Sequence, residues 1–104
     1  MNDRLTVAVD PELSDLIPNF LARKRADARV IAAAVERSEF ASVASLAHRL
    51  KGEGGSYGFP AISAMGAALE SAAHARDRAS ARSVAMRILA YLERVEVIYR
   101  SPEG

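Results

Sequence analysis

A histidine and a lysine lie three residues apart in a segment that otherwise carries mostly small side chains. The segment is 47-AHRLKGEGGSYGF-59, and it contains His48, Lys51 and four glycines between positions 52 and 58. An imidazole nitrogen is a good nucleophile near neutral pH, because the ring titrates there. A lysine ammonium nearby suits an anion that approaches the ring or is attached to it. The two residues could therefore accept and hold an anionic group.

The glycines need a reason, because each disfavours a helix by about 1 kcal/mol relative to alanine. An α-helix turns about 100° per residue, which places the neighbours of His48 on a helical wheel. Apolar residues lie away from His48 and should face the core: Phe40, Val43, Leu46, Ala47, Leu50 and Tyr57. Gly54 is also on the core side and should mark close packing. Ala44, Gly52 and Gly55 share the face of His48, so we expect an exposed imidazole on a surface open to another macromolecule.

Helical signals precede this segment. Asp10 can cap a short helix that runs from Pro11 to about Ile17. Pro18 should end or kink that helix. A second helix is expected from residue 19 to about 37, because apolar residues recur there at helical spacing. Lys24 falls within its apolar stripe and is expected to turn its charged end outward.

Further helical signals follow. Ser38 can cap the helix of the opening segment, which Gly58 should end. The next helix is expected over residues 61–75, and Asp77 or Ser80 can cap the last one. The apolar stripe of the last helix is expected to comprise Val84, Ile88, Tyr91, Leu92, Val95, Ile98 and Tyr99. No strand is expected anywhere in the chain.

These elements predict an all-α fold, namely an antiparallel up-down four-helix bundle with a short additional N-terminal helix. The helices should occupy residues 10–100, with 1–9 as an N-terminal extension and 101–104 as a tail that frays. The chain has 104 residues and no linker or internal repeat. It therefore predicts a single domain.

The composition argues against several classes of function. There is no cysteine and there are only two histidines, so no metal site is expected. The formal charge of +1 gives no electrostatic footprint for nucleic acid. No apolar run approaches the about 20 residues that span a membrane, and the first residues lack the apolar core of a signal peptide. We expect a soluble, cytoplasmic and monomeric protein.

The motif H-x-x-K-G at residues 48–52, followed by small residues and Gly58, resembles the histidine-containing phosphotransfer (HPt) domain of bacterial multistep phosphorelays. Leu69 and Glu70 in the next helix also fit the pattern of this family. The resemblance extends over roughly residues 10–100. It implies a four-helix bundle that carries phosphoryl groups and has no catalytic centre of its own.

The resemblance also implies roles and partners. His48 would accept a phosphoryl group from the aspartate of one response-regulator receiver domain and pass it to another, with Lys51 as the charge partner of the phosphoryl group. An upstream hybrid histidine kinase would feed the relay. Mg²⁺ would be bound by the receiver, so no cofactor is expected on this chain. The receiver-docking surface would comprise Ala44, Arg49, Gly52, Gly55 and Ser56. Arg49 and Glu53 depart from the commonest family pattern and are interpreted as adjusting partner choice.

Other classes of function remain as alternatives. A helical-bundle adaptor could bind a signalling partner without phosphorylation, although the presence of both His48 and Lys51 argues against it. An enzyme could use His48 as a general base, but no carboxylate at helical spacing orients the ring, and an exposed face excludes water poorly. ATP-dependent kinase activity is not expected, because no glycine-rich phosphate loop joins a strand to a helix. The histidine domain of a chemotaxis-type kinase would need its ATP-binding segment on another polypeptide.

Overall fold

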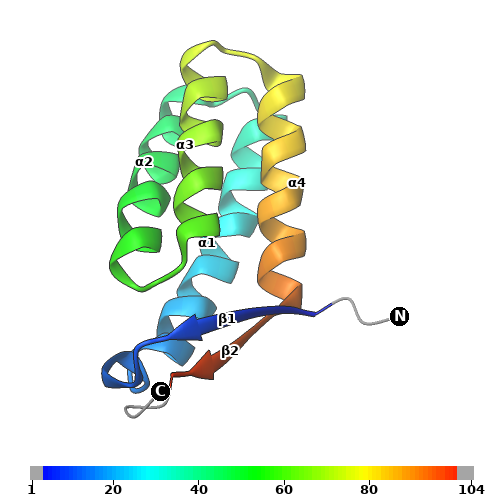
Figure 1. The fold of residues 1–104 in the computed structure, drawn as a ribbon. Helices are drawn as coiled ribbons and strands as arrows, with labels where there is room; N and C mark the ends of the chain where they lie inside the picture. Colours follow the sequence, from blue (N-terminus) through cyan, green and yellow to red (C-terminus); the bar gives the residue numbers. More distant parts are fainter. Residues whose placement is uncertain (1–3, 101–104) are drawn as a thin grey trace.

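The computed structural model describes residues 4–100, and its four helices pack side by side with a small sheet at one end (Figure 1). The elements in chain order are β1 (Leu5–Val9), the 3₁₀ helix η1 (Pro11–Leu13), α1 (Ile17–Glu36), α2 (Phe40–Ser56), α3 (Pro60–His74), α4 (Arg78–Arg94) and β2 (Val95–Tyr99). Each helix packs against the next one, and α4 returns to α1. The predicted four-helix bundle is therefore confirmed. The tail at 101–104, predicted to fray, lies outside the described residues.

The predicted short N-terminal helix is wrong. The segment expected to be an extension contains strand β1, and only Pro11–Leu13 form a 3₁₀ turn. Asp10 does cap this turn, because its side chain accepts a hydrogen bond from the backbone N–H of Glu12 at 2.9 Å. Pro18 lies in the first turn of α1, where its missing N–H leaves no helical hydrogen bond unmade. It therefore belongs to the start of α1 and ends no helix.

The last helix is shorter than predicted, because its apolar stripe continues into a strand. Helix α4 ends at Arg94, and the next five residues form β2, which pairs with β1 in parallel. β-Branched residues in both segments suit a pleated strand. Ile98 and Tyr99 are 53% and 41% exposed, so their predicted place in a helical core stripe is wrong. The expectation of a purely helical chain is corrected to a helical bundle with a two-stranded sheet.

Helix boundaries follow the predicted signals in part. Asp77 caps α4, because its side chain accepts a hydrogen bond from the backbone N–H of Ser80 at 3.1 Å. Gly58 follows α2 with a φ of 88°, a conformation that glycine adopts readily. Ser38 does not cap α2, since Glu39 holds that position and its side chain makes no capping hydrogen bond.

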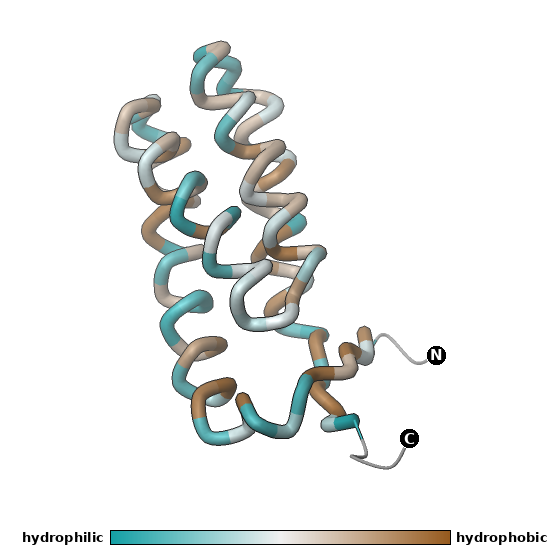
Figure 2. The backbone as a smooth tube through the Cα atoms, turned by 60° about the vertical axis from the view of Figure 1, so that its left-hand side comes forward, coloured by the Kyte–Doolittle hydropathy of each residue, from teal (hydrophilic) through white to brown (hydrophobic). Residues whose placement is uncertain are grey.

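The core consists of the apolar stripes that the helical period predicts. Figure 2 shows hydrophobic and hydrophilic residues alternating along the helices. The largest buried apolar side chains include Phe20, Ile31, Leu50, Phe59, Ile62, Leu69, Ile88 and Leu92. On α2, all the residues predicted to face the core are buried or partly buried. Among residues 4–100, no helix is both long enough and apolar enough to cross a membrane.

Lys24 lies inside the protein, which contradicts the prediction that its charged end turns outward. Its side chain is 2% exposed, and its ammonium forms ion pairs with Asp27 at 2.8 Å and with Glu53. A buried charge needs such partners because it has lost its water. Glu53 is therefore committed to Lys24, which ties α1 to the C-terminal part of α2. Its interpretation as an acid that adjusts partner choice stays a prediction, beside this contact within the protein.

Helices α2 and α3 approach so closely that their backbones meet at two glycines. A Cβ atom on Gly54 would lie 2.5 Å from the Ser63 backbone nitrogen, and one on Gly66 would lie 2.6 Å from the Lys51 backbone nitrogen. The hydroxyl of Ser63 adds a hydrogen bond across this contact, donating to the Lys51 carbonyl at 2.6 Å. The predicted packing role of Gly54 is confirmed. Gly66 has the same role, which the sequence analysis did not predict.

A methyl group at Gly66 should destabilise the bundle. Gly66→Ala forces the added atom against the backbone of α2, and overpacking of this kind lowers the free energy of unfolding by about 1–3 kcal/mol. Denaturant titration followed by circular dichroism measures the change. Gly52→Ala is the matched control, because no heavy atom lies within 4 Å of its added Cβ, and it should gain up to about 1 kcal/mol. An unchanged midpoint for Gly66→Ala would contradict a tight contact.

Candidate functional site

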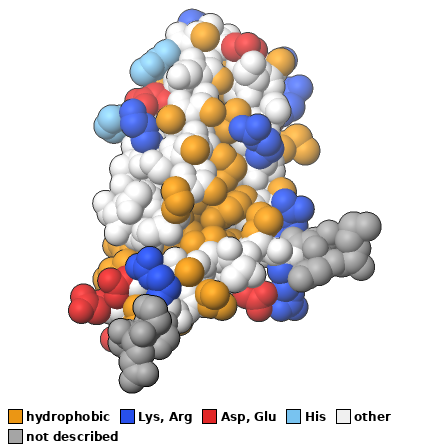
Figure 3. Space-filling model, in the orientation of Figure 1, with side chains coloured by type: hydrophobic (Ala, Val, Ile, Leu, Met, Phe, Trp, Pro, Cys, Tyr) orange, Lys and Arg blue, Asp and Glu red, His pale blue; other side chains and the backbone are white. Residues whose placement is uncertain are grey.

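His48 lies on the outer face of α2, and its side chain is 70% exposed. The buried residues of α2 point to the opposite side of the helix, as the helical period predicts. Figure 3 shows the histidine side chains projecting from the surface, close to acidic and basic side chains. The imidazole is therefore within reach of another macromolecule.

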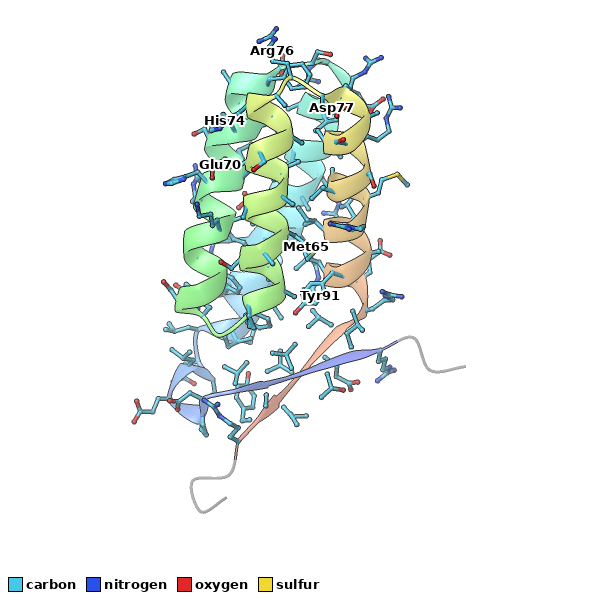
Figure 4. The ribbon with its side chains drawn as sticks, turned by 45° about the horizontal axis from the view of Figure 1, so that its top comes forward. Met65, Glu70, His74, Arg76, Asp77 and Tyr91 are labelled. Carbon is cyan, nitrogen blue, oxygen red and sulfur yellow. The ribbon has the colours of Figure 1, made fainter. Side chains whose placement is uncertain are left out.

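Glu70 of α3 contacts both charged residues of the motif. Its Oε2 lies 3.0 Å from Nδ1 of His48, and its Oε1 lies 3.6 Å from Nζ of Lys51. Glu70 is only 18% exposed, whereas His48 and Lys51 stand above it on α2. Figure 4 labels Glu70 on the side of α3 that faces α2. The three side chains form one polar cluster across the two helices.

The ionisation of Glu70 follows from these contacts. Burial alone would raise the pKa of its carboxyl group. The hydrogen bond from His48 and the positive charges of His48 and Lys51 outweigh burial and hold the pKa below its ordinary value. The carboxylate therefore stays ionised at neutral pH.

The ionised carboxylate decides which nitrogen of His48 carries the proton. A carboxylate only accepts hydrogen bonds, so Nδ1 of His48 must be the donor. In the neutral ring the lone pair then resides on Nε2. No hydrogen bond from residues 4–100 occupies Nε2. The cluster thus presents an exposed nucleophilic nitrogen and a ring whose orientation is fixed from behind.

Sequence reasoning missed the contact between Glu70 and the ring. Glu70 lies on another helix and so not at helical spacing from His48, and in the sequence it stood out only as part of a family pattern. The contact depends on the approach of α3 to α2 at Gly66, which precedes Glu70 by one helical turn and so lies on the same face. A glycine one turn before an acid was the available signal. No carboxylate at helical spacing contacts the ring, as expected, but Glu70 of the neighbouring helix does.

The surface around His48 carries little bulk. An added Cβ at Gly52 or Gly55 would meet no heavy atom within 4 Å, so both glycines face open space. Ala44 is partly buried, and Arg49 and Ser56 are exposed. The Ser56 hydroxyl donates to the Gly52 carbonyl at 3.2 Å, which holds it against its own helix. The structure therefore brings all five predicted docking residues to α2 and leaves the two glycines clear.

Metal ligands do not gather near this cluster. Within residues 4–100, no group of three or more histidine, cysteine, aspartate or glutamate side chains could hold a metal ion. Glu53, the nearest acid of α2 in sequence, pairs with Lys24. His74 is exposed and lies one helical turn beyond Glu70.

Comparison with known families identifies the class of protein that this fold and site define. A model of the Hpt domain matches residues 15–97, which is most of the chain. The chain belongs to the Hpt domain family, and the resemblance noted in the sequence is confirmed. Membership implies a histidine phosphotransfer role in a phosphorelay. No curated protein and no solved structure matches the chain significantly.

Removal of the Glu70 carboxylate should change the tautomer of His48. In the wild type, the neutral ring should hold its proton on Nδ1, and Glu70→Ala should shift a substantial share to Nε2 because the acceptor is lost. The ¹⁵N chemical shifts of the ring nitrogens, recorded at alkaline pH, report this share. The His74 side chain makes no hydrogen bond to any of residues 4–100, so this ring serves as an internal reference. Identical His48 shifts in both proteins would show that Glu70 does not set the tautomer.

Proposed function

We propose that this protein carries a phosphoryl group on Nε2 of His48 and exchanges it with the aspartate of response-regulator receiver domains. The observation that carries the proposal is the hydrogen bond between Nδ1 and Glu70. It assigns the proton to one nitrogen and leaves the other one exposed with its lone pair. A side chain that is 70% exposed can enter the active site of another protein, whereas a buried one cannot.

The transfer step can be written from these atoms. The lone pair of Nε2 attacks the phosphorus of an aspartyl phosphate, an N–P bond forms, and the P–O bond to the aspartate breaks. The aspartate leaves as a carboxylate, and the proton on Nδ1 stays in place. The imidazole ring becomes positively charged, and the Glu70 carboxylate balances that charge at 3.0 Å. The reverse step returns the phosphoryl group to an aspartate.

Lys51 is proposed as the charge partner of the phosphoryl group. Its ammonium lies 3.6 Å from Oε1 of Glu70, and its side chain is half exposed. A flexible lysine stem lets the ammonium turn from the carboxylate towards the phosphoryl oxygens. Glu70 would thus hold Lys51 near the ring until the anion arrives.

The receiver is proposed to supply the rest of the catalytic apparatus. Phosphoryl transfer needs charge stabilisation by a metal ion and positioned groups, and Mg²⁺ would be bound by the acidic pocket of the receiver. The proposed docking surface comprises Ala44, Arg49, Gly52, Gly55 and Ser56. An upstream hybrid histidine kinase would deliver phosphoryl groups through its own receiver domain. With these partners, we propose that the protein acts in the cytoplasm.

No ATP-dependent kinase activity is proposed for this chain. No strand was expected, but residues 4–100 contain β1 and β2, so a phosphate loop after a strand has to be considered. The β1 strand, however, continues through Asp10 and Pro11 into a 3₁₀ turn and not through a glycine-rich loop. The known way of cradling ATP phosphates between a strand and a helix is therefore missing at this junction.

A phosphate-independent adaptor remains the second candidate. The adaptor hypothesis does not require a tautomer fixed by Glu70, nor an ammonium beside the ring. General-base catalysis by His48 is also compatible with the Glu70 contact, but the exposed ring would leave a substrate in water.

Replacement of His48 should abolish phosphorylation. Incubation with a phosphorylated receiver domain should label the wild type with an acid-labile phosphate, whereas His48→Gln should take up none. Circular dichroism should be unchanged, because the side chain is largely exposed. His74→Gln is the matched control and should be labelled like the wild type. Label on a folded His48→Gln protein would reject the assignment, and an unlabelled wild type across all receivers of the source organism would favour the adaptor.

Bulk at Gly52 should block transfer while sparing the fold. Gly52→Gln projects into the open space where the receiver would dock, so transfer should slow at least about tenfold, equivalent to about 1.4 kcal/mol of barrier. The melting temperature should stay the same or rise, because a helical glycine is removed. Gly54→Gln is the opposite case and should destabilise the bundle, since its Cβ would meet the backbone of α3. Transfer by Gly52→Gln at the wild-type rate would show that the receiver does not dock there.

A further inference from the structure

Strand β2 leaves apolar side chains and backbone groups uncovered at the end of the bundle. Within residues 4–100 the sheet has two strands, and such a sheet is marginally stable by itself (Figure 1). On β2, Ile98 is 53% exposed and Tyr99 is 41% exposed, and both are among the most exposed large hydrophobic residues of the described chain. Natural proteins usually protect edge strands with lysine, proline or a covering segment. The sequence of β2, VEVIY, contains neither lysine nor proline.

The hydrogen bonds to β1 show which groups of β2 point outward. Val9 is the register partner of Tyr99, and the Arg100 backbone N–H donates to the Val9 carbonyl at 3.0 Å. In a parallel ladder, the N–H and C=O groups of a residue bond to the two residues that flank its register partner. Val9 therefore bonds to Ile98 and Arg100, and alternate residues of β2 direct their backbone groups to β1. Val97 and Tyr99 therefore direct their N–H and C=O groups to the outer edge. Among residues 4–100, no other backbone group bonds to them there.

A second copy of β2 fits this edge in one register. Two copies can pair in an antiparallel manner about a two-fold axis at Ile98, which sets Val97 opposite Tyr99. Each such pair exchanges both of its N–H···O bonds, using the groups that point outward. Glu96 then lies opposite Arg100 of the second copy, and the same ion pair forms twice.

The symmetric registers centred on Tyr99, Val97 or Glu96 lack this complementarity. An axis at Tyr99 would place Ile98 opposite Arg100 and form no ion pair. An axis at Val97 would place Glu96 opposite Ile98 and form no ion pair. An axis at Glu96 would place the two glutamates face to face, which is unfavourable. Charge therefore selects the register centred on Ile98.

The exposed face of the sheet supports the same register. Glu96, Ile98 and Arg100 alternate along the strand, point to one face and are all exposed. Directly opposite residues whose backbones are not hydrogen-bonded bring their side chains closest, and the two copies of Ile98 would form such a pair. Glu96 also pairs with Arg4 of its own copy at 3.0 Å, through Oε1 alone. Its second carboxylate oxygen can accept a hydrogen bond from Arg100 of the second copy.

We propose that the protein forms a two-fold symmetric homodimer in which two β2 strands pair and join two small sheets into a single four-stranded one. This proposal departs from the expectation of a monomer and is independent of the proposed phosphotransfer. Glu70 lies up the bundle, away from the sheet (Figure 4). Both copies would therefore present their His48 clusters to receivers at the same time.

Sedimentation velocity over a range of concentrations tests the proposal with the full chain. The wild type should reach about twice the 11.2 kDa of one chain at high micromolar concentration and dissociate on dilution. Val97→Pro should remain a monomer at every concentration, because proline lacks the outward N–H and leaves the bonds to β1 intact. Ile98→Lys should also remain a monomer, because the two lysine ammonium groups would face each other at the two-fold axis and repel. This second variant decides the matter if circular dichroism shows that Val97→Pro is misfolded.

The matched control is the same substitution on the outer edge of the other strand. Ala8 directs its backbone groups away from β2, because Val9 uses its own to bond with that strand. Ala8→Pro should therefore dimerise like the wild type. A wild type that stays monomeric throughout would overturn the proposal. So would a dimer that survives in folded Ile98→Lys, or one that Ala8→Pro abolishes.

Discussion

The contact between the backbones of α2 and α3 is the constraint on which the site depends. Gly54 and Gly66 leave no room for a Cβ atom, so the two helices meet at van der Waals distance. Because Glu70 lies one turn beyond Gly66, this approach brings its carboxylate to 3.0 Å from the His48 ring. A wider helix spacing would leave the imidazole free to rotate and to take either tautomer. The chemistry proposed for His48 is thus a consequence of packing.

The two sides of α2 explain why one helix carries so many glycines. Gly54 faces inward and sets the helix spacing, whereas Gly52 and Gly55 face outward and leave open space beside the imidazole. Glycine weakens a helix, so this segment needs support from elsewhere. The buried ammonium of Lys24 supplies it by pairing with Glu53, in the middle of the glycine-rich turn. The same few residues therefore combine an open surface with a fixed backbone.

The fold and the site were predictable where they depend on a single helix. The exposed face of His48 and the inward side of Gly54 follow from the angle between residues along α2. The contact of Glu70 with His48 depends on how two helices pack, and the burial of Lys24 depends on acids that only the folded chain supplies. Strand β2 was missed for a related reason. Its apolar residues continue the stripe of α4, and only pairing with β1 decides between helix and strand.

The ring nitrogen that carries the phosphoryl group tests the central claim most directly. Protein with ¹⁵N-labelled histidine can be phosphorylated by a receiver domain and examined by NMR for coupling between ¹⁵N and ³¹P. With Nδ1 held by Glu70, the phosphorus should couple to Nε2 of His48, and Nδ1 should keep its proton. Coupling to Nδ1 of His48 would contradict the account, because that atom cannot bond to phosphorus and donate to the carboxylate at once.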